Sequence, residues 1–209
     1  MRIRPEQLEG HLQQQLLPIY FLSGEEPLQL MEAGDAVRRA ARAAGHSERE
    51  VLHVESGFDW SALQSASSNL SLFSERRLIE LRLPSGKPGD AGARVLTEYA
   101  ASAPDDTVLL IVSGRLERRQ QQTKWFKALD GAGAVVQVWP VEHRQLPGWI
   151  TGRFRERGID ISRDGARLLA ERVEGNLLAA AQEVEKLRLL YGEVQIDAEM
   201  VEQGVADSA

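Results

Sequence analysis

Short apolar runs that alternate with helix-like segments constrain this chain most. Two of them, 19–22 and 108–112, consist almost entirely of Ile, Leu, Val, Phe and Tyr, the pattern of strands buried on both faces. Three further strand-like runs lie at 50–54, 77–83 and 134–139. Strand and helix alternating five times predicts a mostly parallel five-stranded sheet with helices on both faces, an α/β fold. The two apolar runs are predicted to lie at its centre.

Helical periodicity fills the remaining sequence and divides the chain at Pro140. Before that proline, three helices are predicted over 25–44, 91–101 and 118–129. A further helix is predicted from a cap at Asp59 through Ala66. After it, no strand is predicted, and the predicted helices are 146–157, 164–173 and 177–191. In the last helix, Val184 and Leu187 belong to an apolar stripe at helical spacing. We therefore expect an α/β domain over 1–140 and a small three-helix domain over 141–209.

The composition excludes several classes of protein. The 209 residues include no cysteine, so disulfides and thiolate metal sites are excluded and a reducing compartment is favoured. No apolar run approaches the ~20 residues that cross a bilayer, and the polar start of the chain is not a signal peptide. We expect a cytoplasmic protein with no membrane partner. The net charge of −6 argues against a dedicated nucleic-acid binder.

The turn between the first predicted strand and the first long helix is where a phosphate loop would lie. Such a loop needs two glycines, a lysine for the outer phosphates and a Ser or Thr for magnesium. The stretch 23–30 has one glycine and no lysine, and Glu25 and Glu26 would repel phosphate at the helix start. The strands that end at Leu83 and Ser113 are not followed by an acidic pair that could hold a metal. The sequence therefore predicts that no ATP is bound.

Other catalytic patterns are missing as well. The four histidines are far apart in the sequence and lack the spacing of metal ligands: His11, His46, His53 and His143. The Gly131–Gly133 stretch precedes a strand, whereas a dinucleotide loop follows one, and there is no nucleophile elbow. We expect no catalytic residue, no metal site and no cofactor, and a function based on binding other proteins.

Three stretches in a fixed order, 20–28, 71–80 and 174–187, carry a family resemblance. With them, the chain resembles the delta subunit of the bacterial DNA polymerase III clamp loader along nearly its whole length. The resemblance implies an AAA+-like first domain with a degenerate phosphate loop and a three-helix lid. It also implies a pentameric loader with gamma or tau and delta-prime subunits as partners. In this family, delta opens the ring-shaped sliding clamp, and the assembled loader acts on primed DNA. The family is part of a DNA polymerase holoenzyme, but this chain's own residues predict no enzyme.

The chain departs from the family pattern at its C-terminal end. Family members continue into a helical collar domain that holds the pentamer together. This chain ends at Ala209, soon after the predicted lid. We interpret it as truncated before the collar, which leaves its assembly with the other loader subunits open.

The resemblance also assigns a function to 69–73. This stretch is similar to the clamp-binding pentapeptide, usually Gln-Leu-Ser/Asp-Leu-Phe, in which an apolar pair enters a pocket of the clamp. The candidate residues, with Asn in the place of the usual Gln, are Asn69, Leu70, Ser71, Leu72 and Phe73. The alternative is that the three apolar side chains pack a turn between a helix and a strand.

A second candidate is the basic segment 115–127. Its candidate DNA-contacting residues are Arg115, Arg118, Arg119 and Lys124. The alternative is a solvated helix face with Trp125 and Phe126 turned into the core. Two rival functions therefore stay open beside clamp binding: a live P-loop relative with an unusual loop, and a nucleic-acid-binding module that uses this helix.

Overall fold

The computed structural model divides the chain into two compact units, Met1–Trp139 (unit 1) and Pro140–Ala209 (unit 2). It describes residues 1–68 and 76–206.

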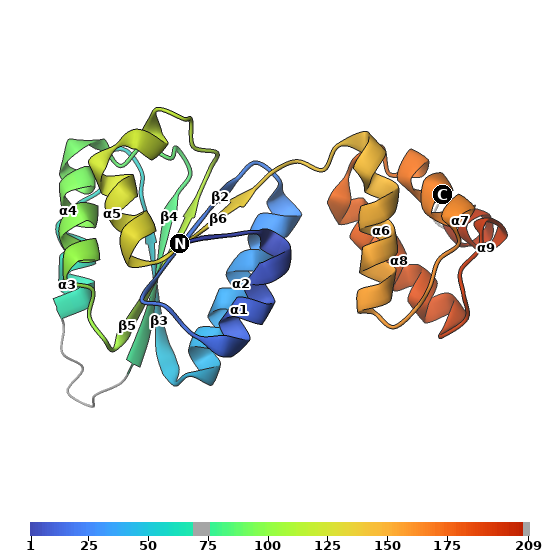
Figure 1. Cartoon of the computed structure of the whole chain (residues 1–209), viewed down its shortest axis with the longest axis horizontal. Coiled ribbons are helices and arrows are strands. Elements are labelled where there is room, and N and C mark those ends of the chain that lie inside the picture. Colours follow the sequence, from blue (N-terminus) through green and yellow to red (C-terminus); the bar gives the residue numbers. More distant parts are fainter. Residues whose placement is uncertain (69–75, 207–209) are drawn as a thin grey trace. The chain divides into compact units, whose positions relative to one another are not determined.

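Unit 1 contains a parallel six-stranded sheet in the order β1-β6-β2-β5-β4-β3 (Figure 1). The strands are β1 (Arg2–Ile3), β2 (Ile19–Gly24), β3 (His46–His53), β4 (Arg76–Leu83), β5 (Thr107–Ser113) and β6 (Ala134–Val138). Each neighbouring pair of strands is parallel. The prediction of a parallel α/β sheet with β2 and β5 at its centre is confirmed, because each of the two has strands on both sides.

The predicted number of five strands is wrong, because β1 adds a sixth at the edge. Arg2 pairs with Val135 and Ile3 with Val136 of β6. The N-terminal ammonium donates hydrogen bonds to the carbonyl oxygens of Asp130, at 2.7 Å, and Gly133, at 2.5 Å. A two-residue strand is too short to show a period of two, so its pairing comes from tertiary contacts alone.

The helices of unit 1 cover both faces of the sheet (Figure 1). On one face lie α1 (Leu8–Gln14) and α2 (Pro27–Ala43), and on the other lie α3 (Ser61–Ser68), α4 (Gly89–Ala101) and α5 (Lys124–Ala132). A 3₁₀ turn, η1 (Pro5–Gln7), leads into α1. The central strand β2 alternates between the two cores. Tyr20 and Leu22 pack toward α1 and α2, whereas Ile19 and Phe21 pack toward α3, α4 and α5.

The helix predicted over 118–129 is in fact broken. A 3₁₀ turn, η2 (Gln120–Gln122), comes first, Thr123 is extended, and α5 begins only at Lys124. Trp125 and Phe126 are buried, and the Phe126 ring meets the Phe21 ring edge-on, with centroids 5.5 Å apart. The alternative interpretation of this segment, in which Trp125 and Phe126 turn into the core, is therefore confirmed for these two side chains.

Unit 2 is helical, as predicted, but has one α-helix more than the three expected. After a 3₁₀ turn, η3 (His143–Gln145), come α6 (Leu146–Glu156), α7 (Arg163–Arg172), α8 (Leu177–Tyr191) and α9 (Ala198–Ala206). Val184 and Leu187 are buried, which confirms the predicted stripe of α8.

The additional helix of unit 2, α9, is short and carries two glutamates and a glycine; in unit 1, α1 was not predicted either. The glycine has a packing role, since a Cβ at Gly204 would lie 2.7 Å from a methyl group of Leu187. The Asp197 carboxylate accepts a hydrogen bond from the Met200 backbone N–H at 2.9 Å, a capping signal that was present in the sequence. Among the described helices of the whole chain, none has the length and apolar character of a membrane span.

Candidate functional site

Three neighbouring strands, β6, β2 and β5, end at the same edge of the sheet. Their parallel register places Gly24 beside Val138 and Ser23 beside Ser113. Because the carboxyl ends coincide, the residues that follow these strands lie close together, where α/β sheets usually bind ligands. A Cβ at Gly24 would lie 2.3 Å from the Val138 carbonyl oxygen, so a side chain does not fit at this position.

The N-terminus of α2, at this edge, is capped by a carboxylate of the chain itself. A Glu26 side-chain oxygen accepts a hydrogen bond from the Gln29 backbone N–H at 2.7 Å. In a phosphate-binding module, such N–H groups and the positive end of the helix dipole would hold the phosphate. Beside it, Glu25 forms an ion pair with Arg115, with 3.1 Å between Oε2 and Nη1. Both glutamates thus have an interaction partner within the chain.

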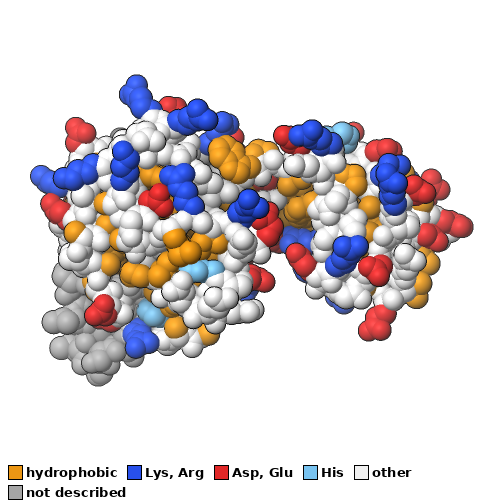
Figure 2. All heavy atoms as spheres, viewed as in Figure 1, with side chains coloured by type: hydrophobic (Ala, Val, Ile, Leu, Met, Phe, Trp, Pro, Cys, Tyr) orange, Lys and Arg blue, Asp and Glu red, His pale blue; other side chains and the backbone are white. Residues whose placement is uncertain are grey.

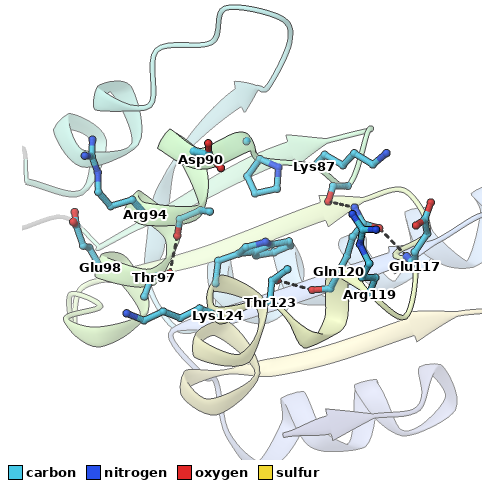
Figure 3. A pocket seen from close by; sticks show the side chains of 15 residues that line it. Lys87, Asp90, Arg94, Thr97, Glu98, Glu117, Arg119, Gln120, Thr123 and Lys124 are labelled. Carbon is cyan, nitrogen blue, oxygen red and sulfur yellow. Dashed lines mark hydrogen bonds between the residues drawn. The ribbon is translucent and has the colours of Figure 1, made fainter.

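Of the four basic residues proposed for DNA contact, two line the same groove. Arg115 is engaged by Glu25, and its guanidinium also lies over the Trp139 ring, 5.5 Å from the centroid. Arg118 is exposed. Arg119 and Lys124 line a groove between α4 and α5 (Figure 3). The structure therefore brings together only two of the four.

This basic groove has a volume of about 850 Å³ and contains two cations that sequence reasoning missed. Lys87 comes from the turn after β4 and Arg94 from α4, whereas Arg119 and Lys124 come from the region around η2 and the start of α5. Within the described residues, none of these four side chains has an ion pair or hydrogen bond. Lys87 and Arg119 lie toward one end of the groove, and Arg94 and Lys124 toward the other (Figure 3).

The basic groove also carries carboxylates and a network of hydrogen bonds. Its acidic side chains are Asp90, Glu98 and Glu117. The Gln120 side chain joins the turn after β4 to the loop after β5. Its amide nitrogen donates to the Gly86 carbonyl at 2.9 Å, and its oxygen accepts from the Glu117 backbone N–H at 2.7 Å. Basic and acidic side chains are also interspersed on the face of the molecule in Figure 2. The groove is therefore rich in unpaired cations but not uniformly positive.

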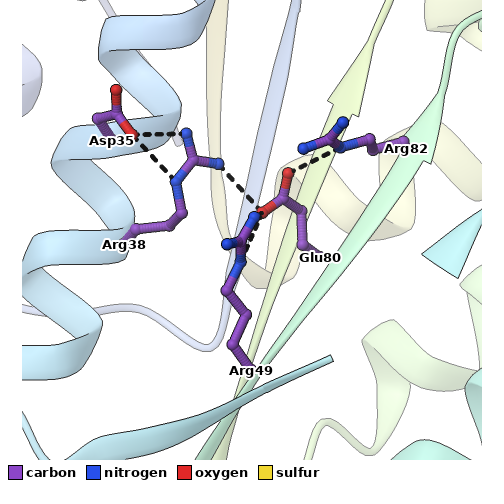
Figure 4. Close-up of polar contacts among 5 residues, drawn as sticks. All are labelled: Asp35, Arg38, Arg49, Glu80 and Arg82. Carbon is purple, nitrogen blue, oxygen red and sulfur yellow. Dashed lines mark hydrogen bonds and ion pairs between the residues drawn. The ribbon is translucent and has the colours of Figure 1, made fainter. Parts of the chain in front are cut away.

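A second group of basic residues surrounds one buried carboxylate on the other face of the sheet (Figure 4). Glu80 of β4 is only 1% exposed and faces α2. Its carboxylate forms ion pairs with Arg38 of α2 at 3.0 Å, Arg49 of β3 at 2.7 Å and Arg82 of β4 at 3.1 Å. Asp35 holds Arg38 from the other side at 2.8 Å. We call these five residues the Glu80 cluster.

The arginines also determine the protonation of Glu80. Burial by itself raises the pKa of this carboxyl group. The hydrogen bond from Arg49, the charge of Arg38 and the hydrogen bond from Arg82 outweigh burial and hold the pKa of Glu80 below its ordinary value of 4.5. The sequence offered a signal for this cluster, since Glu80 lies between the apolar residues Ile79 and Leu81 of β4.

Within residues 1–68 and 76–206, no group of three or more His, Asp or Glu side chains is arranged to hold a metal ion.

Comparison with known proteins identifies the family. The family model described as DNA polymerase III, delta subunit, matches residues 20–138, which is more than half of the chain. The chain belongs to the DNA polymerase III delta subunit family.

Relatives in this delta family align with the whole chain. DNA polymerase III subunit delta of Escherichia coli strain K12 is 34% identical over 209 residues, which cover 100% of this chain and 61% of that protein. The subunit delta of Haemophilus influenzae is 28% identical, with the same two shares. The chain therefore spans less than two thirds of the length of these delta subunits.

Solved structures confirm the AAA+-like fold. The Bacillus subtilis DNA clamp loader delta protein superposes with a TM-score of 0.75 at 19% identity, over 95% of this chain and 61% of that one. The Thermotoga maritima RuvB Holliday junction branch migration motor gives a TM-score of 0.55 at 11% identity, over 97% of this chain and 68% of that one. At these identities, the similarity concerns the fold alone.

The pentapeptide that resembles the clamp-binding motif of the delta family lies outside the described residues. Asn69, Leu70, Ser71, Leu72 and Phe73 come after α3, which ends at Ser68, and before β4, which begins at Arg76. Their role in binding stays a prediction.

Proposed function

We propose that this chain is a non-catalytic clamp-loader subunit that binds and opens the replicative sliding clamp. The observation that carries the proposal is the match of the delta family model over 20–138, a range that includes the pentapeptide 69–73. In the assembled loader, its partners would be the gamma or tau subunits, the delta-prime subunit and primed DNA.

The geometry at the start of α2 supports protein binding over nucleotide hydrolysis. Glu26 accepts the Gln29 N–H that a phosphate would use, and Glu25 adds a second negative charge. A phosphate would therefore meet repulsion where a phosphate-binding loop supplies attraction. We expect a titration of the chain with magnesium-ATP to give no saturable heat. A micromolar dissociation constant would support the rival function, a live P-loop relative.

The apolar pair Leu72 and Phe73 is the proposed anchor on the clamp. Burying two such side chains in a pocket contributes ~1.5–3 kcal/mol each before ordering costs. Because a folded domain holds both ends of the segment, docking costs less ordering entropy than docking a free peptide. Leu70, Ser71 and Asn69 would add contacts around this anchor.

The test is the double variant Leu72→Ala/Phe73→Ala, measured by surface plasmon resonance on immobilised sliding clamp. We expect affinity to fall by at least about a hundredfold, or ~2.7 kcal/mol, with the melting temperature nearly unchanged. The matched control is Leu189→Ala/Leu190→Ala, which removes an equally apolar, exposed pair from α8 of unit 2 and should leave affinity unchanged. Unchanged affinity of the first variant would place the contact elsewhere. A loss that accompanies unfolding would assign the pair to the core.

A second candidate function is weak DNA contact through the basic groove. The observation that favours it is the set of four cations on that groove that have no ion pair within the part of the chain that the structure describes, two of them from the segment 115–127. The three carboxylates of the groove and the net charge of −6 predict low affinity.

Binding of labelled primed DNA over a range of salt concentrations tests this candidate. We expect Lys124→Ala to weaken binding and to lower the slope of log affinity against log salt by about 1, as expected when one phosphate contact is lost. Lys127→Ala is the matched control, because Lys127 is an exposed lysine of the same helix that does not line the groove. Equal effects of the two variants would exclude a specific role for the groove.

A further inference from the structure

Three side chains join the strand ends at the carboxyl edge of the sheet in unit 1. Glu25 follows β2, Arg115 lies two residues beyond β5, and Trp139 follows β6 directly. Arg115 binds the other two, through a 3.1 Å ion pair with Glu25 and through its position 5.5 Å from the Trp139 ring centroid. We call these three residues the edge cluster.

Two glycines allow the backbone to bring the edge cluster together. A Cβ at Gly24 would lie 2.3 Å from the Val138 carbonyl oxygen, and a Cβ at Gly114 would lie 2.4 Å from the Pro84 carbonyl oxygen. Because neither position accepts a side chain without displacement of backbone, the chain passes close to its neighbours just before Glu25 and just before Arg115. The positions of these two residues therefore follow from backbone packing.

Trp139 needs an explanation, because it is a large aromatic residue that is 52% exposed. A guanidinium within about 6 Å of an indole centroid is attracted to the negative face of the ring. Arg115 supplies that cation, and Glu25 holds the same guanidinium through an ion pair. The exposed indole is thus tied to unit 1 by a polar neighbour, without being buried.

Trp139 is also the last residue of unit 1, and the connection to unit 2 is short. Only residues 140–142 separate it from η3 (His143–Gln145). Pro140 has a fixed φ angle, and the residue before a proline is restricted to extended conformations. If Trp139 is held, few backbone dihedrals remain that can change the direction of the connection.

We propose that Arg115 is a positioning residue that anchors Trp139, so that movement of the linker begins only after residue 139. In this proposal, the carboxyl edge of the sheet, where α/β folds usually bind ligands, holds the start of the linker. Each contact is exposed and weak, so the anchor limits the motion of the linker without abolishing it. The proposal does not depend on which protein the chain binds.

Pulsed electron paramagnetic resonance tests the proposal on the full chain. The chain has no cysteine, so spin labels at Ala43→Cys of α2 and Glu171→Cys of α7, two exposed positions, are unique. We expect Arg115→Ala to broaden the label-to-label distance distribution at least twofold, and Trp139→Ala to broaden it similarly. Trp139→Phe keeps an aromatic face and should retain the parent width, as should Lys127→Ala, which removes an exposed cation elsewhere in unit 1.

A thermal melt checks that each variant is folded. If Arg115→Ala is poorly folded, Glu25→Gln, which removes only the ion pair, replaces it and should broaden the distribution to a smaller extent. Parent-like widths in folded Arg115→Ala, or in folded Glu25→Gln and Trp139→Ala, would overturn the proposal. Broadening by Lys127→Ala equal to that of Arg115→Ala would overturn it as well.

Discussion

Two groups of basic side chains lie on opposite faces of one sheet and differ in how their charge is balanced. In the Glu80 cluster, a single buried carboxylate receives three arginines, from α2, β3 and β4 (Figure 4). In the basic groove, four cations have no ion pair within the described residues, although three carboxylates line the same groove (Figure 3). The first group has its counter-ion inside the protein, and the second does not.

The presence or absence of an ion-pair partner within the protein distinguishes charges that stabilise the fold from charges that are available for binding. A buried carboxylate requires partners, because an unpaired buried charge is strongly destabilising. The arginines around Glu80 are therefore needed by the fold. The cations of the groove are exposed and stabilise nothing by pairing, so an external anion can bind them without breaking an internal contact. Removing charges from each group tests this distinction.

The largest effect is expected from Glu80→Gln. We expect the free energy of unfolding of unit 1 to fall by about 2–3 kcal/mol, less than the ~3–5 kcal/mol for a fully buried pair, because the arginines partly reach water. Urea unfolding measures this change. Glu48→Gln is the control, since Glu48 is an exposed carboxylate paired with Arg77 at 3.5 Å and should cost under about 1 kcal/mol. Equal losses in both variants would remove the distinction between the two kinds of charge.

The contribution of Glu80 should also depend on pH. Because its pKa is lower in the folded than in the unfolded chain, its stabilisation is fully present above the ordinary value of 4.5 and is lost as the pH falls through the folded-state pKa. The difference in unfolding free energy between the parent and Glu80→Gln should therefore be constant near neutral pH and shrink in acid. Unfolding curves of both proteins from about pH 7 to pH 3 measure it. If the difference in unfolding free energy grew in acid, the pKa of Glu80 would be raised, not lowered, by folding.

The smallest effect on stability is expected from the basic groove. Arg94→Ala combined with Arg119→Ala should change the free energy of unfolding by less than about 0.5 kcal/mol, because neither side chain loses an ion pair. The same urea experiment checks this value. A loss above about 1.5 kcal/mol would show that the groove cations support the fold, and would weaken their assignment to DNA contact.

The sequence predicted the central part of the fold well. The strand β5 was predicted with the bounds that it has, Thr107–Ser113, and so was the helix α8, Leu177–Tyr191. The strand is a continuous apolar run and the helix has an apolar stripe at helical spacing, so local pattern and tertiary burial agree in both. The missed elements, β1, α1 and α9, are short. They pack against β6, α2, and α7 with α8, respectively, and such tertiary contacts are not recorded in a local sequence pattern.

The candidate sites were predicted less completely. The acidic start of α2 was recognised from the sequence, because Glu25 and Glu26 occupy a position whose role follows from the order of strand and helix. The DNA-contact group was drawn from one continuous segment, and the structure separates Arg115 from Arg119 and Lys124 and adds Lys87 and Arg94. The segment between β5 and α5 is not one regular helix, because η2 interrupts it. The sequence spacing of its basic residues therefore does not indicate which side chains share a groove.

The sequence by itself determined the parallel α/β architecture, the change to a helical unit after Pro140 and the carboxylates at the start of α2. Each of these follows from local order: the length and polarity of a run, a proline, or the residues next to a strand end. The ion pairs between residues far apart in the chain follow from the tertiary structure alone. Glu80 meets Arg49 and Arg38 from 31 and 42 residues away in the chain, and Arg115 meets Glu25 from 90 residues away. Ion pairs act over a few ångströms in space, so their partners are set by how the strands and helices pack and not by their order in the sequence.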